Sequence, residues 1–267
     1  MRRMIFRREL KSNARGLVIW SLVLGGLVLM MMSVYPSFAE DAQTAEEMLN
    51  VFPEPLAKVF GMDTLNLGTY TGFYGVEVHL INTLVGSVYA ALLAAGMLAK
   101  EENDHTAEFL LSKPVTRIEV TGQKLAAVLT NLFMLNAVIA AVSFACTGFA
   151  DEAVELDILV WYLLATFLLH VTVASVSFLL SAVMRRTRSI VSLALGIVFL
   201  SYALHIMAGL SDRFDFLRHV SLFSFTDAAA IVENGGLDAP CAAVMVLVSL
   251  LCALGAIGYY HNKDITG

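Results

Sequence analysis

Six separate apolar runs, each about 20 residues or longer, constrain what this chain can fold into. A helix needs roughly 20 apolar residues to cross the hydrocarbon core of a bilayer. Only helices and closed barrels satisfy their backbone hydrogen bonds in lipid, and the runs lack the two-residue alternation of barrel strands. Of the 267 residues, 58% are hydrophobic and only 15% are charged. The sequence therefore predicts an all-α integral membrane protein.

The predicted spans cover residues 17–35, 78–99, 125–148, 158–183, 189–210 and 241–260. Pro36 is expected to close the first span, since proline ends most helices. The basic segment before that span, residues 1–15, is expected either to form a short amphipathic helix on the inner membrane surface or to anchor the first span on that side, and the two are compatible. No composition shift indicates a second domain, so we expect one transmembrane domain over residues 1–267.

Lys and Arg are distributed unevenly between the two sides of the membrane. With the amino terminus inside, all but three of the 17 Lys and Arg fall on the cytoplasmic side. The exceptions are Lys58, Arg213 and Arg218. The bias of loop Lys and Arg sets orientation. We therefore expect both termini in the cytoplasm, with residues 100–124 on the same side, and a multi-pass protein of the plasma membrane.

Motifs for catalysis are absent from the sequence. It has no GxxxxGK[ST] phosphate loop, no HExxH, no GxSxG and no Cys/His cluster with metal-ligand spacing. The sequence predicts a chain that is not an enzyme, with no metal or cofactor of its own and no nucleic-acid partner. Cys146 and Cys241 are expected near the outer ends of their helices. They could form a disulfide there or remain free thiols.

Ionisable side chains are nearly absent from the predicted spans. This disfavours an ion-coupled carrier, which typically needs buried charges along its path. His170 falls near the middle of the fourth span and is either a neutral packing residue or a substrate-facing one. His79 and His205 are expected near the outer interface, where histidines are half hydrated. Polar residues in the spans either join helices by hydrogen bonds or line a substrate pathway. The candidates for a pathway are Asn82, Asn131, Asn136 and His170.

The inner loop after the second span reads KEENDHTAEFLLSKPVTRIEVTGQK over residues 100–124. The pair Asn103-Asp104 can cap a short helix, and Pro114 ends it. Thr116 and Glu119 form a capping-box signature for a helix that runs into the third span. The loop therefore predicts a short cytoplasmic helix that exposes Phe109 to lipid or to a partner protein.

This loop resembles the signature loop of ABC-2 type transporter permeases. It has an acidic start at Glu101, a Leu-Leu-Ser patch, a Pro-Val-Thr-Arg step that ends at Arg117, and Lys124 at the start of the next span. His105 stands where the family commonly has glycine. Weaker likenesses lie at residues 8–20, 221–225 and 262–265, so the resemblance extends over nearly the whole chain.

The resemblance implies the membrane-spanning subunit of an ATP-binding-cassette transporter, in a family that mostly exports. A second permease subunit, identical or paralogous, would complete the pathway, and a separate ATPase subunit would bind ATP and Mg. The inner loop would be the coupling helix, and the outer segment 211–240 would control the exit. The implied ATPase contacts are Glu101, Glu102, His105, Glu108, Phe109, Leu110 and Arg117. Two alternatives stay open: a non-transporting scaffold or sensor subunit, and an ion-coupled secondary carrier.

Overall fold

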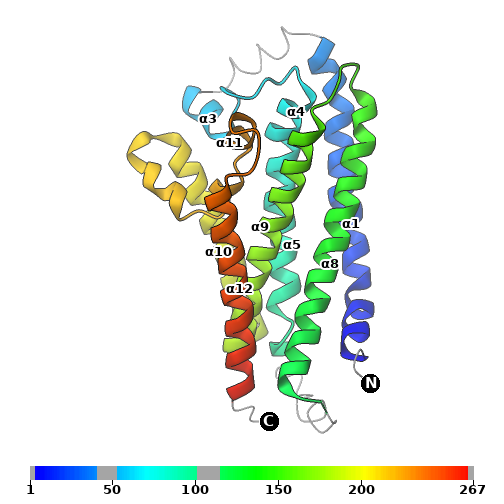
Figure 1. The fold of residues 1–267 in the computed structure, drawn as a ribbon, viewed down its shortest axis with the longest axis vertical. Coiled ribbons are helices and arrows are strands. Elements are labelled where there is room, and N and C mark those ends of the chain that lie inside the picture. Colours follow the sequence, from blue (N-terminus) through cyan, green and yellow to red (C-terminus); the bar gives the residue numbers. More distant parts are fainter. Residues whose placement is uncertain (1–3, 41–52, 101–114, 264–267) are drawn as a thin grey trace.

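The described residues form an elongated bundle of helices that run along its long axis (Figure 1). The structure is a computed structural model, and it describes residues 4–40, 53–100 and 115–263. Six helices in those ranges are long and apolar enough to cross a membrane, and no strand occurs there. This confirms the predicted class. The long helices are α1 (Met4–Glu40), α5 (Leu80–Ala95), α8 (Arg117–Cys146), α9 (Leu156–Val183), α10 (Thr187–Leu210) and α12 (Ala239–Asn262).

The first helix differs from its prediction at both ends. The basic amino-terminal segment forms the first turns of α1 from Met4 onward and is not a separate surface helix. Pro36 lies inside α1, which continues to Glu40, so the expected stop is wrong. Neighbouring Tyr35 packs its ring against Tyr70 and Phe73, with ring centroids 5.7 Å away in each case. We attribute the continued helix to this packing, which opposes the cost of a helical proline.

The second span begins eight residues earlier than predicted. It starts with α4 (Tyr70–Phe73), passes through a π-helical stretch, η1 (Tyr74–His79), and continues as α5. Thr69 caps this start by accepting a hydrogen bond from the amide of Gly72 at 3.2 Å. Glu77 therefore lies within the helical segment, although the span was predicted to begin at residue 78. Tyrosines and glycines make this start too polar for a hydropathy argument to find.

The predicted capping box at the start of the third span is confirmed. The amide of Glu119 donates to Thr116 Oγ1 at 3.2 Å, and the amide of Thr116 donates to Glu119 Oε2 at 3.0 Å. These bonds satisfy amides that a helix start otherwise leaves without partners. The entry into α8 from the inner loop is thus fixed by local sequence.

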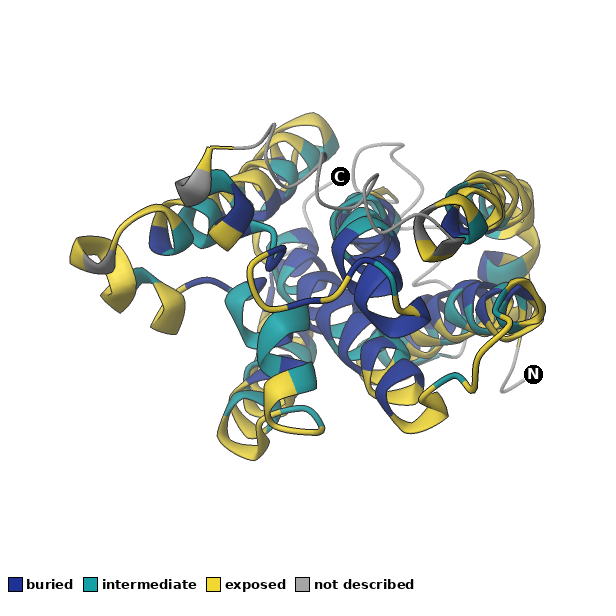
Figure 2. Cartoon of the chain, turned by 90° about the horizontal axis from the view of Figure 1, so that it is seen from above, coloured by how far each residue is buried: buried dark blue, intermediate teal, exposed yellow. Residues whose placement is uncertain are grey.

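Helix α9 forms the centre of the bundle. It packs against α5, α8, α10 and α12, while α1 packs mainly on α8. Tyr162, Leu169 and Phe178 of α9 are completely buried. Buried residues concentrate at the centre when the bundle is viewed along its axis, and exposed ones surround it (Figure 2). The exposed surface of the outer helices is apolar, as expected for lipid contact.

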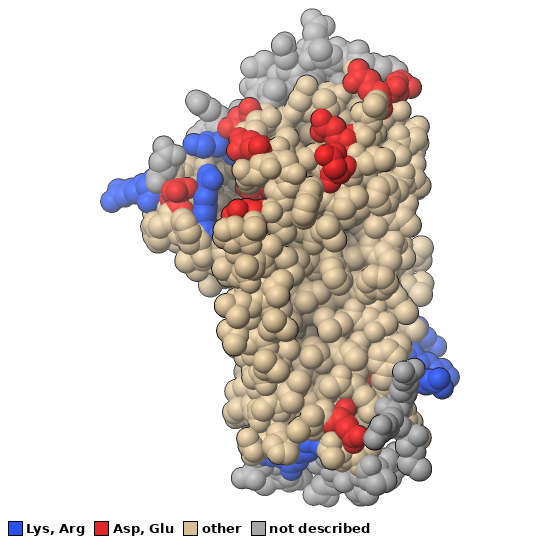
Figure 3. Space-filling view, in the orientation of Figure 1, with Lys and Arg blue, Asp and Glu red and all other residues tan. Residues whose placement is uncertain are grey.

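The two ends of the molecule differ in structure and charge. Both termini lie at one end, as an even number of spans requires (Figure 1). The other end carries the short helices η2 (Thr147–Phe149), α3 (Glu54–Val59), η3 (Asp212–His219), η4 (Ser224–Thr226) and α11 (Ala228–Glu233). Acidic groups gather at that end, and a wide uncharged band separates the ends (Figure 3). We call the end with the termini the inner end; its place in the cytoplasm stays a prediction from charge.

Candidate functional site

A line of polar side chains follows the contact between α5 and α9. His170 of α9 is fully buried and its Nε2 donates to the backbone carbonyl of Asn82 at 3.1 Å. Its Nδ1 has no hydrogen-bond partner among the described residues. The ring lies directly over Gly86, where an added Cβ would be 2.3 Å from the imidazole Nε2 and Cε1. Gly86 therefore permits the close approach on which this contact depends.

His79 continues this line toward the outer end. Its Nε2 donates to the carbonyl of Thr226 at 2.7 Å, and its Nδ1 lies 3.3 Å from Thr166 Oγ1. The centroids of the Tyr162 ring and the His79 imidazole are 4.9 Å apart, and the Tyr162 hydroxyl donates to Ala228 O at 3.5 Å. His79 is only 3% exposed, so the expectation of a half-hydrated histidine is wrong. The outer segment covers it, which no local pattern in the sequence reveals.

The four candidates for a substrate pathway do not form one site. Asn82 and His170 meet across α5 and α9 through the contact described above. Asn131 and Asn136 lie on α8, and each amide nitrogen donates to a carbonyl of its own helix, four residues earlier, at 2.8 Å. Asn82 is buried, its side chain makes no well-formed hydrogen bond, and the gap beside it is too small for a water molecule. Asn82, Asn131 and His170 are therefore buried within the bundle, whereas Asn136 is half-buried.

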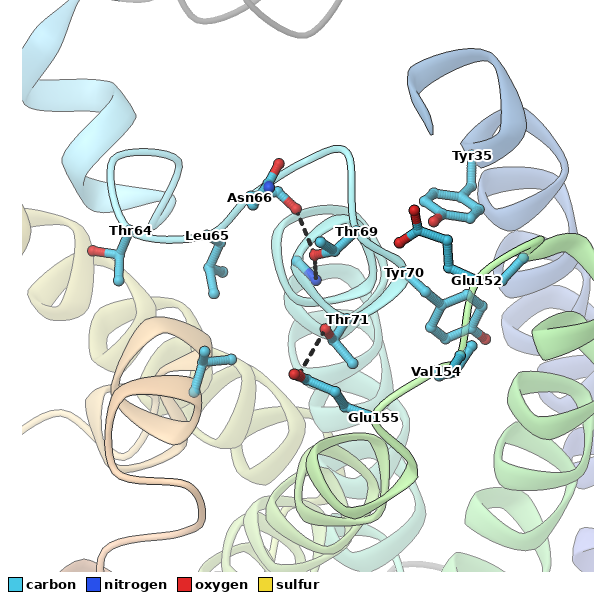
Figure 4. Close-up of a pocket in the computed structure, with 14 residues that line it drawn as sticks. Tyr35, Thr64, Leu65, Asn66, Thr69, Tyr70, Thr71, Glu152, Val154 and Glu155 are labelled. Carbon is cyan, nitrogen blue, oxygen red and sulfur yellow. Dashed lines mark hydrogen bonds between the residues drawn. The ribbon is translucent and has the colours of Figure 1, made fainter. Parts of the chain in front are cut away.

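Larger hollows lie at the ends of the bundle. The outer one, of about 330 Å³, is lined by the rings of Tyr35 and Tyr70, by hydroxyl groups and by Glu152 and Glu155 (Figure 4). Thr71 Oγ1 donates to Glu155 Oε2 across it at 3.4 Å. A hollow with carboxylates and aromatic rings suits small cationic or polar groups better than anions. It lies at the outer end of the bundle.

A buried ion pair at the inner end was missed by the sequence analysis. Lys124 of α8 and Glu9 of α1 are 1% and 2% exposed, and the Lys124 Nζ lies 3.8 Å from Glu9 Oε1. The same ammonium group donates to the carbonyl of Met97, just after α5. Lys124 was noted at the start of the third span, but its pairing with a residue 115 positions away is visible only in the folded chain.

The residues implied in the ATPase contact fall mostly outside the described ranges. Glu101, Glu102, His105, Glu108, Phe109 and Leu110 all lie there, so their prediction stays untested. Arg117 is described: its guanidinium donates to the carbonyls of His261, at 3.4 Å, and of Lys263. It thus caps the inner end of α12, where a cation is favourable beside unpaired carbonyls.

Metal-binding side chains do not cluster among the described residues. No group of three or more His, Cys, Asp or Glu in the searched ranges could hold a metal ion. The cysteines Cys146, Cys241 and Cys252 are free thiols.

Comparison with known proteins agrees with the loop resemblance. A family model described as ABC-2 family transporter protein matches residues 3–219, which is most of the chain. No curated protein sequence matches it significantly. The matched region includes the first five membrane-spanning helices and the whole inner loop. The chain, a multi-pass membrane protein with six helices able to span the bilayer, belongs to the ABC-2 family of transporter permeases.

Proposed function

We propose that the chain is the membrane-spanning subunit of an ATP-driven exporter, powered by a separate ATPase subunit that binds ATP and Mg. The family match over residues 3–219 carries this proposal. The sequence has no phosphate-binding loop, so nucleotide must be bound elsewhere. The excess of Lys and Arg in the loops of the inner end supports a cytoplasmic position for that end in this proposal. The membrane is then the plasma membrane of the cell.

A second permease subunit, identical or paralogous, completes the pathway in this proposal. The packing of the bundle supports it, because the polar residues of the core contact each other and leave no substrate-sized space beside Asn82 or His170. Substrate would therefore pass between two subunits. Movement of one subunit against the other would open the pathway, as in other rigid-body transitions.

The proposal is tested by charge reversal in the inner loop. Glu101, Glu102 and Glu108 are changed together to Lys in the complex purified with its ATPase and reconstituted in liposomes. We expect membrane insertion to be unaffected and the ATPase to dissociate or to lose its response to the permease. The matched control reverses Asp151, Glu152 and Asp157, three exposed acids of the outer end.

The outcomes separate the proposal from its alternatives. Equal ATP hydrolysis and equal assembly in both triple variants would contradict ATPase docking at this loop. Transport that persists without ATP and stops when the proton gradient is dissipated would identify an ion-coupled carrier instead. Stable assembly with an ATPase, without transport of any tested compound, would favour a scaffold or sensor subunit.

A further inference from the structure

The start of the inner loop is held by a side chain of α9. Helix α5 ends at Ala95, and the chain continues through Leu98 and Ala99 toward the loop. The backbone amides of Leu98 and Ala99 both donate to Ser181 Oγ, at 2.9 and 3.1 Å. Ser181 lies in the last turn of α9 and is fully buried. One hydroxyl group therefore fastens the inner end of the second span to the inner end of α9.

A second contact reaches the same point from the other side. The Lys124 ammonium group of α8 donates to Met97 O and pairs with Glu9 of α1. The Lys124 side chain and the Ser181 hydroxyl thus bind consecutive residues, Met97 by its carbonyl and Leu98 by its amide. Four helices, α1, α5, α8 and α9, meet where the inner loop begins.

The attachment of α5 to α9 continues to the outer end. In the middle, His170 lies on Gly86 and donates to Asn82 O. Farther out, His79 contacts Thr166 of α9 and donates to Thr226 of the outer segment. A displacement of α9 along its axis therefore changes hydrogen bonds at the outer segment as well. Tightly packed helices transmit a displacement, because their interface switches between a few defined arrangements and does not deform gradually.

We propose that Ser181 is a positioning residue for energy coupling, which makes α9 follow the inner loop when the ATPase moves it. The inference rests on the proposed function, since it takes the ATPase contact with the loop as given. The Ser181 hydroxyl accepts hydrogen bonds from two backbone amides next to that loop. Without it, the end of the second span can move while α9 and the outer segment stay in place.

The experiment measures movement at the outer end in the ATPase complex, held in lipid nanodiscs. Spin labels are attached at Gly148→Cys and Asn234→Cys, both exposed, after replacement of the native cysteines. Their separation is compared without nucleotide and with ATP and vanadate. The test variant is Ser181→Ala. The matched control is Ser177→Ala, because Ser177 is also buried but donates to Val173 of its own helix.

The unsubstituted chain and the Ser177 control should show a nucleotide-dependent change in the label separation. The complex that contains Ser181→Ala should still hydrolyse ATP, but the population with the shifted label separation should fall about fivefold, the lower end of typical coupling effects. An equal shift in the Ser181 and Ser177 variants would overturn the inference and leave the proposed function intact. No shift in the unsubstituted chain would contradict the proposed ATP coupling itself.

A second measurement does not depend on the folding of a Ser181 variant. Labels at Lys100→Cys and Val183→Cys flank the hydroxyl contact at the inner end, and both positions are exposed. Their separation should stay constant between nucleotide states while the outer pair moves. A change in the inner separation alongside the outer one would show that the contact breaks during the cycle, and it would refute the positioning role.

Discussion

Substitution of Gly86 by alanine tests the close contact at the centre of the bundle. The added Cβ would lie 2.3 Å from two atoms of the His170 ring, whereas ordinary contacts begin at 3.4 Å. The ring or the helix must therefore move by about 1 Å, which stretches the 3.1 Å bond from His170 to Asn82 O beyond hydrogen-bond range. The substitution should separate α5 from α9.

The expected cost follows from three contributions. Overpacking of a core costs about 1–3 kcal/mol, and loss of an interhelical hydrogen bond in a membrane costs about 0.6–1.7 kcal/mol. Replacing a helical glycine by alanine returns about 1 kcal/mol. The net destabilisation is about 2 kcal/mol, which lowers Tm by about 4–8 °C in a chain of this size.

The assay is thermal unfolding of the purified protein in detergent. Gly196→Ala in α10 is the control, because an added Cβ there meets nothing within 4 Å; it should leave Tm unchanged or raise it. His170→Ala should relieve the clash, so a double-mutant cycle with Gly86→Ala should give a coupling of about 1–3 kcal/mol. A Gly86→Ala protein as stable as the Gly196 control would refute the described packing.

Two further predictions concern the inner end and the orientation of the chain. Lys124→Met should lower the free energy of unfolding by about 3–5 kcal/mol, because it leaves the Glu9 carboxylate buried without its cation. Thermal unfolding should show a smaller loss of stability when Glu9→Gln is added to Lys124→Met. Stability losses that simply add in the double variant would contradict the pairing. For orientation, Asn234→Cys should react with a membrane-impermeant maleimide in intact cells, and Arg186→Cys only after permeabilisation. The reverse pattern would place both termini outside.

The architecture could be predicted because each span is specified locally. Hydrophobic length identifies a membrane helix without knowledge of its neighbours. The capping box of Thr116 and Glu119 was predictable for the same reason, since its two residues are three apart. The start of the second span failed this local test, because Tyr70 and Tyr74 pack in the core of the bundle although this segment is too polar to be found by hydropathy.

The tertiary contacts of the candidate site could be predicted only in part. Tyr162, Thr166 and His170 recur at four-residue spacing, which indicates a polar stripe on one face of α9. Nothing in the sequence indicates which residues face that stripe. The contacts from His170 to Asn82, and from Ser181 to Leu98, join residues more than 80 positions apart. Their pairing depends on how the helices assemble.

The central claim is that an ATPase docks on the inner loop, and photo-crosslinking tests it most directly. A photoreactive phenylalanine analogue replaces Phe109 in one preparation and Phe216, an exposed residue of the outer η3 segment, in another. Both are irradiated in native membranes, and the crosslinked products are identified by mass spectrometry. We expect Phe109 to crosslink to a subunit with a phosphate-binding loop, and Phe216 not to do so. Crosslinks from Phe109 to lipid alone would contradict the account.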